Sequence, residues 1–284
     1  MAQSTRAAAS ARAAQMRAEE ARKDRRRKNL IAAVVVVIVV IIAVVLGAVI
    51  ANRPSGAGSA AGSGASALQK LTSIPAATLD DAAAPSPQQA PAKLDGATEI
   101  KVDGKPQVLY VGAEYCPFCA VERWALIGAL SRFGTFSGIT ETTSSSTDVH
   151  PDTPTFSFVN AKYQSDYVSL KTVETQDREG KPLQSLEGDA AALFQKYNTG
   201  GSIPWINYGG TNATTGATVD STAFDGKTYD QIIDGILDPN SDLGKTVLPA
   251  VNVITAQICQ QNGGKPSNVC TAAGVQSASV LLKR

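Results

Sequence analysis

The chain contains little histidine and little methionine. Its 284 residues include one histidine, His150, and two methionines, Met1 and Met16. Hydrolase triads and most metal-assisted hydrolases depend on histidine, so its scarcity argues against hydrolysis. Copper delivery normally adds histidine or methionine to cysteine, and both methionines lie at the N-terminus. His150, in the sequence DVHPDTP, is expected to be a solvated loop residue.

Cysteine is also scarce, with four residues: Cys116, Cys119, Cys259 and Cys270. A structural zinc site usually combines two closely spaced pairs of ligands. Here one pair is CxxC but the other is separated by ten residues, so we expect no metal and no other cofactor. The even number permits complete pairing in three connectivities.

Charge is absent from one long stretch. Residues 30–50 read LIAAVVVVIVVIIAVVLGAVI, without a polar or charged side chain. A helix of this length spans about 31 Å, close to the ~30 Å apolar core of a bilayer. We therefore predict a transmembrane helix over residues 30–51. A cleaved secretory signal is the alternative, but its apolar region is usually shorter; either would export the remainder of the chain.

Basic residues are concentrated before this stretch. Residues 1–29 hold nine Lys or Arg and three acidic side chains, a net charge of +6, whereas the rest of the chain carries −5. Because cytoplasmic flanks are enriched in Lys and Arg, the N-terminus is predicted to be cytoplasmic and residues after about 52 extracytoplasmic. The predicted location is the cell membrane, crossed once, with the basic tail near anionic lipid. A DNA-binding tail is the alternative; we expect no nucleic-acid partner.

Residues 52–98 are predicted to be a flexible linker with a short helical segment. The stretch 52–67 is rich in Gly, Ser and Ala, which indicates a flexible tether. LQKLTSIPAATLDDA (68–82) could form one or two helices, and 84–93 looks irregular.

From residue 99 to 284 the pattern is that of a packed α/β domain. An apolar strand is predicted at 106–113, and a helix follows from the cysteines to Phe133. Further strands are predicted at 136–144, 155–160, 166–174 and 203–210, and further helices at 187–197, 228–238 and 247–261. Alternating strands and helices favour an α/β sheet.

The segment EYCPFCAVERW places the Cys116–Cys119 pair between the strand and the helix. If Cys116 is the N-cap, Pro117 occupies the first helical position, which suits its fixed φ. The Cys116 sulfur then faces unpaired backbone N–H groups and the positive end of the helix dipole. These features favour the thiolate, which is the nucleophile in disulfide exchange. We predict that Cys116 attacks and that Cys119 resolves the mixed disulfide.

A second element is GGSIPWINYGG, in which Pro204 opens a strand. A proline there lacks the N–H donor that a ladder requires. If the Ile203–Pro204 bond is cis and lies beside the cysteines, a neighbouring backbone is left free to pair with an incoming peptide. Pro204 is therefore predicted to support a substrate groove.

The order strand–CxxC–helix, helix, Ile-Pro-strand resembles the thioredoxin fold. VGAEYCPFCAVERWALIGALSRFGTFSG, SSSTDVHPDTPTFSFVNAKYQSDYVSL and NVITAQICQQNGGKPSNVC together look like the domain-of-unknown-function 929 family, over roughly residues 68–270. The resemblance implies a thioredoxin-like domain, often membrane-tethered, with redox roles for Cys116, Cys119 and Pro204, but it supplies no known reaction. The intervening Pro-Phe differs from the pairs of thioredoxins and of strongly oxidising periplasmic enzymes, so the direction of electron flow stays open.

The remaining cysteines are separated by QQNGGKPSNV, a segment that can turn back on itself. We predict a structural Cys259–Cys270 disulfide. The alternative is a second redox pair that passes electrons to Cys119. Among the residues that flank the CxxC pair, Glu114, Glu122 and Arg123 are expected to be surface or ion-paired residues, although a carboxylate could relay a proton.

The sequence therefore predicts a membrane-anchored extracytoplasmic thiol–disulfide oxidoreductase. Its partners would be extracytoplasmic protein thiols or disulfides and a membrane redox partner that recycles the pair. The alternative is a non-catalytic accessory or assembly subunit of a membrane complex, in which Cys116–Cys119 is a permanent structural disulfide. A third reading, metal delivery, would require tight copper or zinc binding by the reduced domain.

Overall fold

The computed structural model describes residues 60–283. The predicted basic tail, the transmembrane helix over 30–51 and the first part of the tether lie outside these residues. Among the helices of the described part, none has the length and apolar character needed to cross a bilayer.

A mixed α/β arrangement is built around strand β3 (Lys105–Gly112), which follows from the apolar run predicted at 106–113. β3 pairs in parallel with β8 (Ser169–Glu174) and antiparallel with β9 (Trp205–Tyr208). β9 pairs antiparallel with β10 (Asn212–Thr215) through a hairpin in which Gly209 and Gly210 both have positive φ. The short strands β1 (Ala92–Lys93) and β2 (Lys101–Val102) pair with β10 and β3, respectively.

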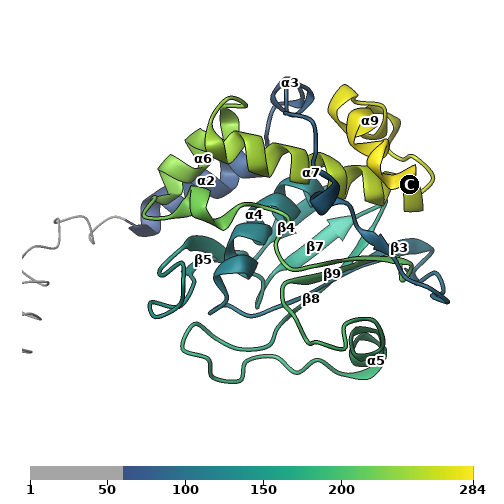
Figure 1. Cartoon of the computed structure of the whole chain (residues 1–284), viewed down its shortest axis with the longest axis horizontal. Helices are drawn as coiled ribbons and strands as arrows, with labels where there is room; N and C mark the ends of the chain where they lie inside the picture. The colour runs from purple at the N-terminus through teal and green to yellow at the C-terminus, as the bar shows by residue number, and fades with distance from the viewer. Residues whose placement is uncertain (1–59, 284) are drawn as a thin grey trace, which may run out of the picture. The chain divides into compact units, whose positions relative to one another are not determined.

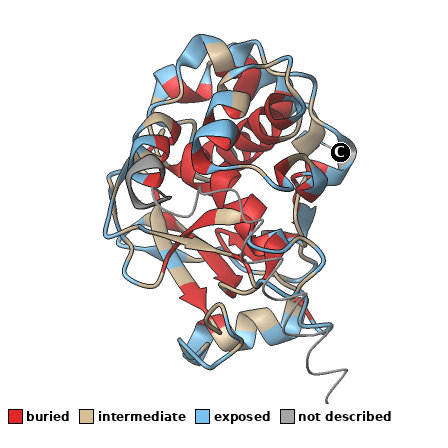
Figure 2. Cartoon of the chain, turned by 90° about the vertical axis from the view of Figure 1, so that its left-hand side faces the viewer, coloured by how far each residue is buried: buried red, intermediate tan, exposed pale blue. Residues whose placement is uncertain are grey.

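Helices cover both faces of this sheet (Figure 1). Helices α4 (Pro117–Leu130) and α7 (Asp242–Gln261) lie on one face, and α5 (Gly188–Tyr197) lies on the other. Successive side chains of β3 alternate between the two layers, as strand geometry requires. Val108 and Tyr110 enter the larger core with α4 and α7, whereas Leu109 and Val111 pack with residues of α5. Buried residues are concentrated in the strands of the sheet and in the helices of the larger layer, whereas α5 has mostly intermediate and exposed residues (Figure 2).

The segment between α4 and β8 adds two small two-stranded sheets. One consists of β4 (Gly134–Ser137) and β7 (Lys162–Ser165), and the other of β5 (Thr140–Thr143) and β6 (Pro154–Ser157). Two hydrogen bonds attach β6 to the first half of α4. Thr155 Oγ1 donates to Ala120 O at 2.7 Å, and Trp124 Nε1 donates to Pro154 O at 3.0 Å.

The packed unit begins before residue 99, where the sequence placed its boundary. Helix α2 (Ala60–Leu71) occupies the end of the predicted tether, and α3 (Ala76–Asp80) and a turn η1 (Pro87–Gln89) follow. The prediction of flexibility for 60–67 is therefore wrong, because composition could not show that Ala67 and Leu71 are completely buried in the core.

The segment after β10 supplies the remaining helices of the layer that contains α4 and α7. A turn η2 (Ser221–Phe224) leads to α6 (Tyr229–Leu237), whose start carries a capping box formed by Thr228 and Gln231. After α7 come α8 (Ser267–Cys270), α9 (Ala273–Ser279) and η3 (Leu281–Lys283).

Candidate functional site at the start of helix α4

The thiol pair lies where β3 leads into α4. Cys116 is the N-cap of α4 and Pro117 is its first residue, as the sequence predicts. The Cys116 Sγ accepts a hydrogen bond from the backbone N–H of Cys119 at 3.2 Å. This bond satisfies one of the N–H groups that every helix start leaves unpaired, and it directs the sulfur toward the positive end of the helix.

The two thiols differ in access. Both cysteines are free thiols, and the exposed fraction is 5% for Cys116 and 0% for Cys119. Cys116 therefore keeps a small exposed area, whereas Cys119 has none. Phe118 lies between them in the sequence. Its side chain is 41% exposed and forms part of the surface beside Cys116.

Electrostatic effects also separate the two thiols. The hydrogen bond from the Cys119 side chain lowers the pKa of Cys116, and this effect outweighs burial, which acts in the opposite direction. Burial raises the pKa of Cys119 well above its usual value. Cys116 is thus the better nucleophile of the pair.

The Ile203–Pro204 segment lies next to the cysteines. Cys116 Sγ is 3.9 Å from Ile203 O, and Ile203 packs against a small cluster formed by Ala113, Cys116 and Cys119. The Ile203–Pro204 bond is cis, and Pro204 is buried. The structure therefore brings three of the predicted site residues together: Cys116, Cys119 and Pro204.

A groove adjoins this site on the side of Tyr115. It has a volume of about 470 Å³, and its lining includes Tyr115, Asp148, Val149 and Arg178. Val149 is 71% exposed. The surface beside Cys116 consequently combines apolar and charged side chains.

A buried ion pair between Arg123 and Glu174 lies near the thiols. The sequence did not identify Glu174 as the partner of Arg123. Arg123 Nε and Nη2 donate to the two carboxylate oxygens of Glu174 at 2.9 and 2.8 Å, and neither side chain is exposed. Burial by itself would lower the pKa of Arg123, but the charge of Glu174 opposes this and the pKa is well above its usual value. The prediction that Arg123 is ion-paired holds, although the pair lies in the interior and not at the surface.

The flanking carboxylates have different environments. Glu122 is completely buried, and its carboxylate accepts hydrogen bonds from Thr218 N at 2.7 Å and from Thr218 Oγ1 at 2.9 and 3.0 Å. Burial raises its pKa to about 7, which corrects the expectation of a surface or ion-paired residue. Glu114 is half-buried, and its backbone N–H donates to Gln176 O at 2.9 Å.

His150 is not the solvated residue that its polar surroundings suggested. Its side chain is 15% exposed, with Nδ1 at 2.7 Å from Asp225 Oδ1 and Nε2 at 2.9 Å from Ser221 Oγ. These groups have the connectivity of a hydrolase triad, but the Asp225 side chain is 52% exposed, whereas the aspartate of such a triad is buried. We interpret the array as a tether between the 144–154 loop and η2. The His150 ring also lies edge-on to Phe118, with ring centroids 5.9 Å apart.

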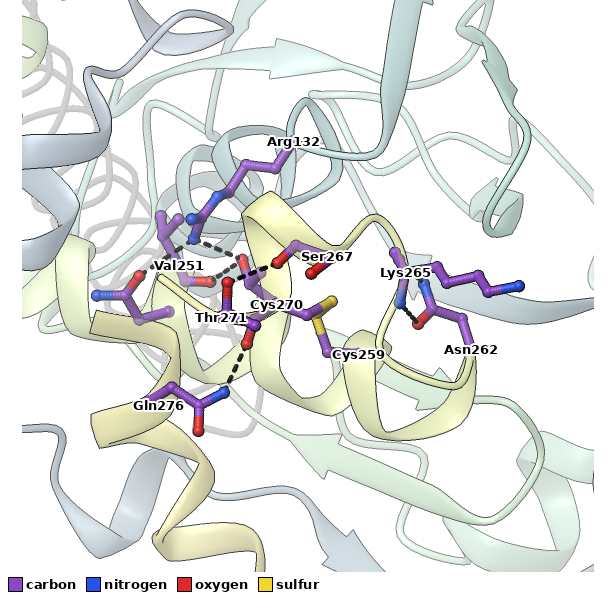
Figure 3. Close-up of a disulfide and its surroundings, with 11 residues drawn as sticks. Arg132, Val251, Cys259, Asn262, Lys265, Ser267, Cys270, Thr271 and Gln276 are labelled. Carbon is purple, nitrogen blue, oxygen red and sulfur yellow. Dashed lines mark hydrogen bonds between the residues drawn. A yellow bond between two sulfur atoms is a disulfide. The ribbon is translucent and has the colours of Figure 1, made fainter. Parts of the chain in front are cut away.

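Cys259 and Cys270 form the disulfide that the sequence predicted (Figure 3). It joins the end of α7 to α8, and Gln276 Nε2 donates to Cys270 O at 2.6 Å. Both cysteines belong to the large hydrophobic core, which has no member in common with the cluster around Cys116 and Cys119. This separation disfavours electron transfer between the pairs and agrees with a structural role.

Together, these features define a mixed α/β protein with a Cys-Pro-Phe-Cys thiol pair at the start of a buried helix. The chain belongs to the family described as Domain of unknown function (DUF929), whose match covers residues 92–260, more than half of the chain. No curated protein and no solved structure matches the chain.

Proposed function

We propose that the chain is a membrane-anchored, extracytoplasmic thiol–disulfide oxidoreductase that acts through Cys116 and Cys119. The observation that carries the proposal is the asymmetry of the pair. Cys116 keeps a small exposed area and its Sγ accepts a hydrogen bond from the Cys119 N–H, whereas Cys119 is completely buried with a raised pKa. An attacking thiol and a protected resolving thiol require this arrangement.

The topology supports a thioredoxin-like fold for the domain. The strands β8, β3, β9 and β10 are adjacent in that order; β8 is parallel to β3, β9 is antiparallel to β3, and β10 is antiparallel to β9. The CxxC pair follows the central strand, and the Ile-Pro segment precedes the neighbouring one. This is the order expected from the thioredoxin resemblance of the sequence.

Two features support an extracytoplasmic location. The Cys259–Cys270 disulfide is of the kind that persists in oxidising compartments. The uncharged segment 30–50 follows a strongly basic tail, as expected for a single span with a cytoplasmic N-terminus. Substrates would be exported proteins with thiols or disulfides, and a membrane redox partner would recycle the pair.

Disulfide exchange by the full chain in mild detergent tests the proposal. Cys116→Ser is expected to reduce turnover of a fluorescent disulfide peptide to the uncatalysed background, because the attacking nucleophile is lost. Cys119→Ala is expected to accumulate mixed disulfides on Cys116 in cells, because the resolving thiol is absent. Cys259→Ala/Cys270→Ala is the matched control and should retain turnover. Full activity in Cys116→Ser would rule the assignment out.

The 5% exposure of Cys116 is the observation that favours the alternative, an accessory subunit with a permanent Cys116–Cys119 disulfide. The reduction potential of the wild-type pair separates the two functions. Structural disulfides lie below about −300 mV, whereas exchange catalysts lie higher. A potential below that value would support the accessory role.

A further inference from the structure

Arg123 is an unusual residue to find in the interior, because burying a charged guanidinium is costly. Such a group is normally paired with an opposite charge and fully hydrogen-bonded. It lies on α4 four residues after Cys119 and is completely buried. Glu174 binds its Nε and Nη2, and its carbon Cζ lies 5.8 Å from the centroid of the Tyr110 ring. Nη1 is buried without a hydrogen-bond partner in the described part of the chain.

The same guanidinium is attached to the thiol cluster. Arg123 Nη2 donates to Ala113 O at 2.8 Å. Ala113 forms one hydrophobic cluster with Cys116 and Cys119, and none of these three residues is more than 5% exposed. The guanidinium, paired with Glu174, is thus held on the backbone of a residue that packs with both cysteines, in an interior that water does not screen.

Arg123 acts on both sulfurs in the same direction. The Cys119 side-chain hydrogen bond lowers the pKa of Cys116, burial opposes it, and the charge of Arg123 lowers it further. Burial raises the pKa of Cys119, and the charge of Arg123 counteracts this rise. Thiolates exist only in the reduced pair, so this charge stabilises the reduced form relative to the disulfide. A pair whose reduced form is stabilised is an oxidant.

We propose that Arg123 is a positioning residue that sets the direction of electron flow, so that Cys116–Cys119 donates its disulfide to dithiols of exported proteins. This inference rests on the proposed function and deepens it by naming the substrate class.

The exchange follows from the geometry. A substrate thiolate attacks Cys116 Sγ of the oxidised pair, and the Cys116–Cys119 bond breaks with its electron pair on Cys119. A second substrate thiolate attacks the substrate sulfur of the mixed disulfide, forms the substrate disulfide and releases Cys116 as a thiolate. The substrate loses two electrons and its thiol protons, and the protein gains two electrons. A disulfide of a membrane partner accepts these electrons and restores the oxidised pair.

The buried ion pair allows a test in which two variants damage the fold alike but act oppositely on the thiols. Arg123→Met removes the positive charge, and Glu174→Gln removes the negative charge that balances it. The full chain in detergent is equilibrated with glutathione buffers, and the Cys116 pKa is measured from the pH dependence of alkylation. Arg123→Met should make the pair about tenfold harder to reduce, roughly 30 mV, with a higher Cys116 pKa. Glu174→Gln should shift both quantities the other way.

An electrostatic effect predicts shifts of opposite sign in the two variants, whereas loosened packing predicts shifts of the same sign. Shifts of the same sign in both variants, or no shift in either, would overturn the proposal. If Arg123→Met does not fold, Arg123→Met/Glu174→Met replaces the whole pair with apolar side chains and should also be harder to reduce than wild type. Arg123→Lys retains the charge and should restore most of the wild-type equilibrium; failure to do so would count against the proposal.

Substrate turnover shows which of the two proposals fails. The wild type should oxidise a reduced unfolded protein faster than it reduces the oxidised form, and Arg123→Met should weaken this preference. If the wild type exchanges disulfides but prefers reduction, the direction is wrong and the oxidoreductase proposal stands. If the wild type exchanges none, the proposed function itself fails.

Discussion

At the scale of the residue, Glu122 shows how burial alters a side chain that has no role in the proposed exchange. Its carboxylate is completely buried and, among residues 60–283, accepts hydrogen bonds only from the backbone N–H and hydroxyl of Thr218. Those neutral donors only partly compensate for lost hydration. Its pKa consequently rises from 4.5 to about 7, so the folded protein keeps this proton over a range in which the unfolded chain has lost it.

This shift predicts the pH dependence of stability. Between about pH 4.5 and 7 the folded state binds one more proton at Glu122 than the unfolded state, so stability falls as the pH rises through this window. The loss amounts to about 3 kcal/mol. Gln cannot ionise, so the stability of Glu122→Gln should not fall in this window. Between pH 4.5 and 8, the stability of Glu122→Gln relative to wild type is therefore expected to rise by about that amount.

Denaturant unfolding of the full chain in detergent across this range measures the effect. Glu99, which is exposed, supplies the control, because Glu99→Gln makes the same chemical change at the surface. Parallel pH profiles for Glu122→Gln and wild type would contradict the prediction.

Which side chains form the site could be predicted from the sequence only in part. Cys116, Pro117 and Cys119 are recognisable because helix-capping rules act between residues that are neighbours in the chain. Arg123 and Glu174 are 51 residues apart. They meet because β8 pairs in parallel with β3 in a register that sets Glu174 opposite Gly112. His150 meets Ser221 across 71 residues for the same kind of reason.

At the scale of the element, length decided what could be predicted. β3 and α4 are long, strongly apolar segments, and both lie where the sequence predicted them. β1, β7 and β10 have two to four residues each and were not predicted. Such short strands carry little periodicity, and their partners in the sheet decide their conformation.

The Cys259–Cys270 disulfide joins the 20-residue helix α7 to the four-residue helix α8, and its Cα atoms are 5.6 Å apart. Cys259→Ala/Cys270→Ala is expected to lose about 2–4 kcal/mol of stability, because the unfolded chain is no longer constrained by the cross-link. For a domain of this size that corresponds to roughly 5–15 °C in Tm. Thermal unfolding followed by circular dichroism measures the shift.

The exchange activity of the same variant below its Tm gives the second result. A structural role leaves turnover unchanged, since the thiol pair at α4 lies in a different cluster. A folded variant without turnover would instead assign Cys259 and Cys270 to the electron path.

At the scale of the whole molecule, the proposed function requires that the thiol pair lie on the extracytoplasmic side of a membrane. The described part, residues 60–283, contains both cysteine pairs, and the charge asymmetry of the segment before it predicts export. An oxidised Cys259–Cys270 pair in the same domain as the free thiols at α4 is compatible with a compartment in which disulfides form.

Single cysteines on either side of the predicted span test this orientation. In a Cys116→Ala/Cys119→Ala background, Ser59→Cys lies after the span and Ser4→Cys lies in the basic tail. A membrane-impermeant maleimide added to intact cells should label Ser59→Cys but label Ser4→Cys only after lysis, because the predicted span separates the two positions. Labelling of Ser4→Cys alone would reverse the topology and place the thiol pair in the reducing cytoplasm. Recovery of the chain in the soluble fraction after carbonate extraction would contradict the predicted transmembrane helix itself. The oxidant role argued for Cys116 needs the first result, because thiols in the cytoplasm are kept reduced.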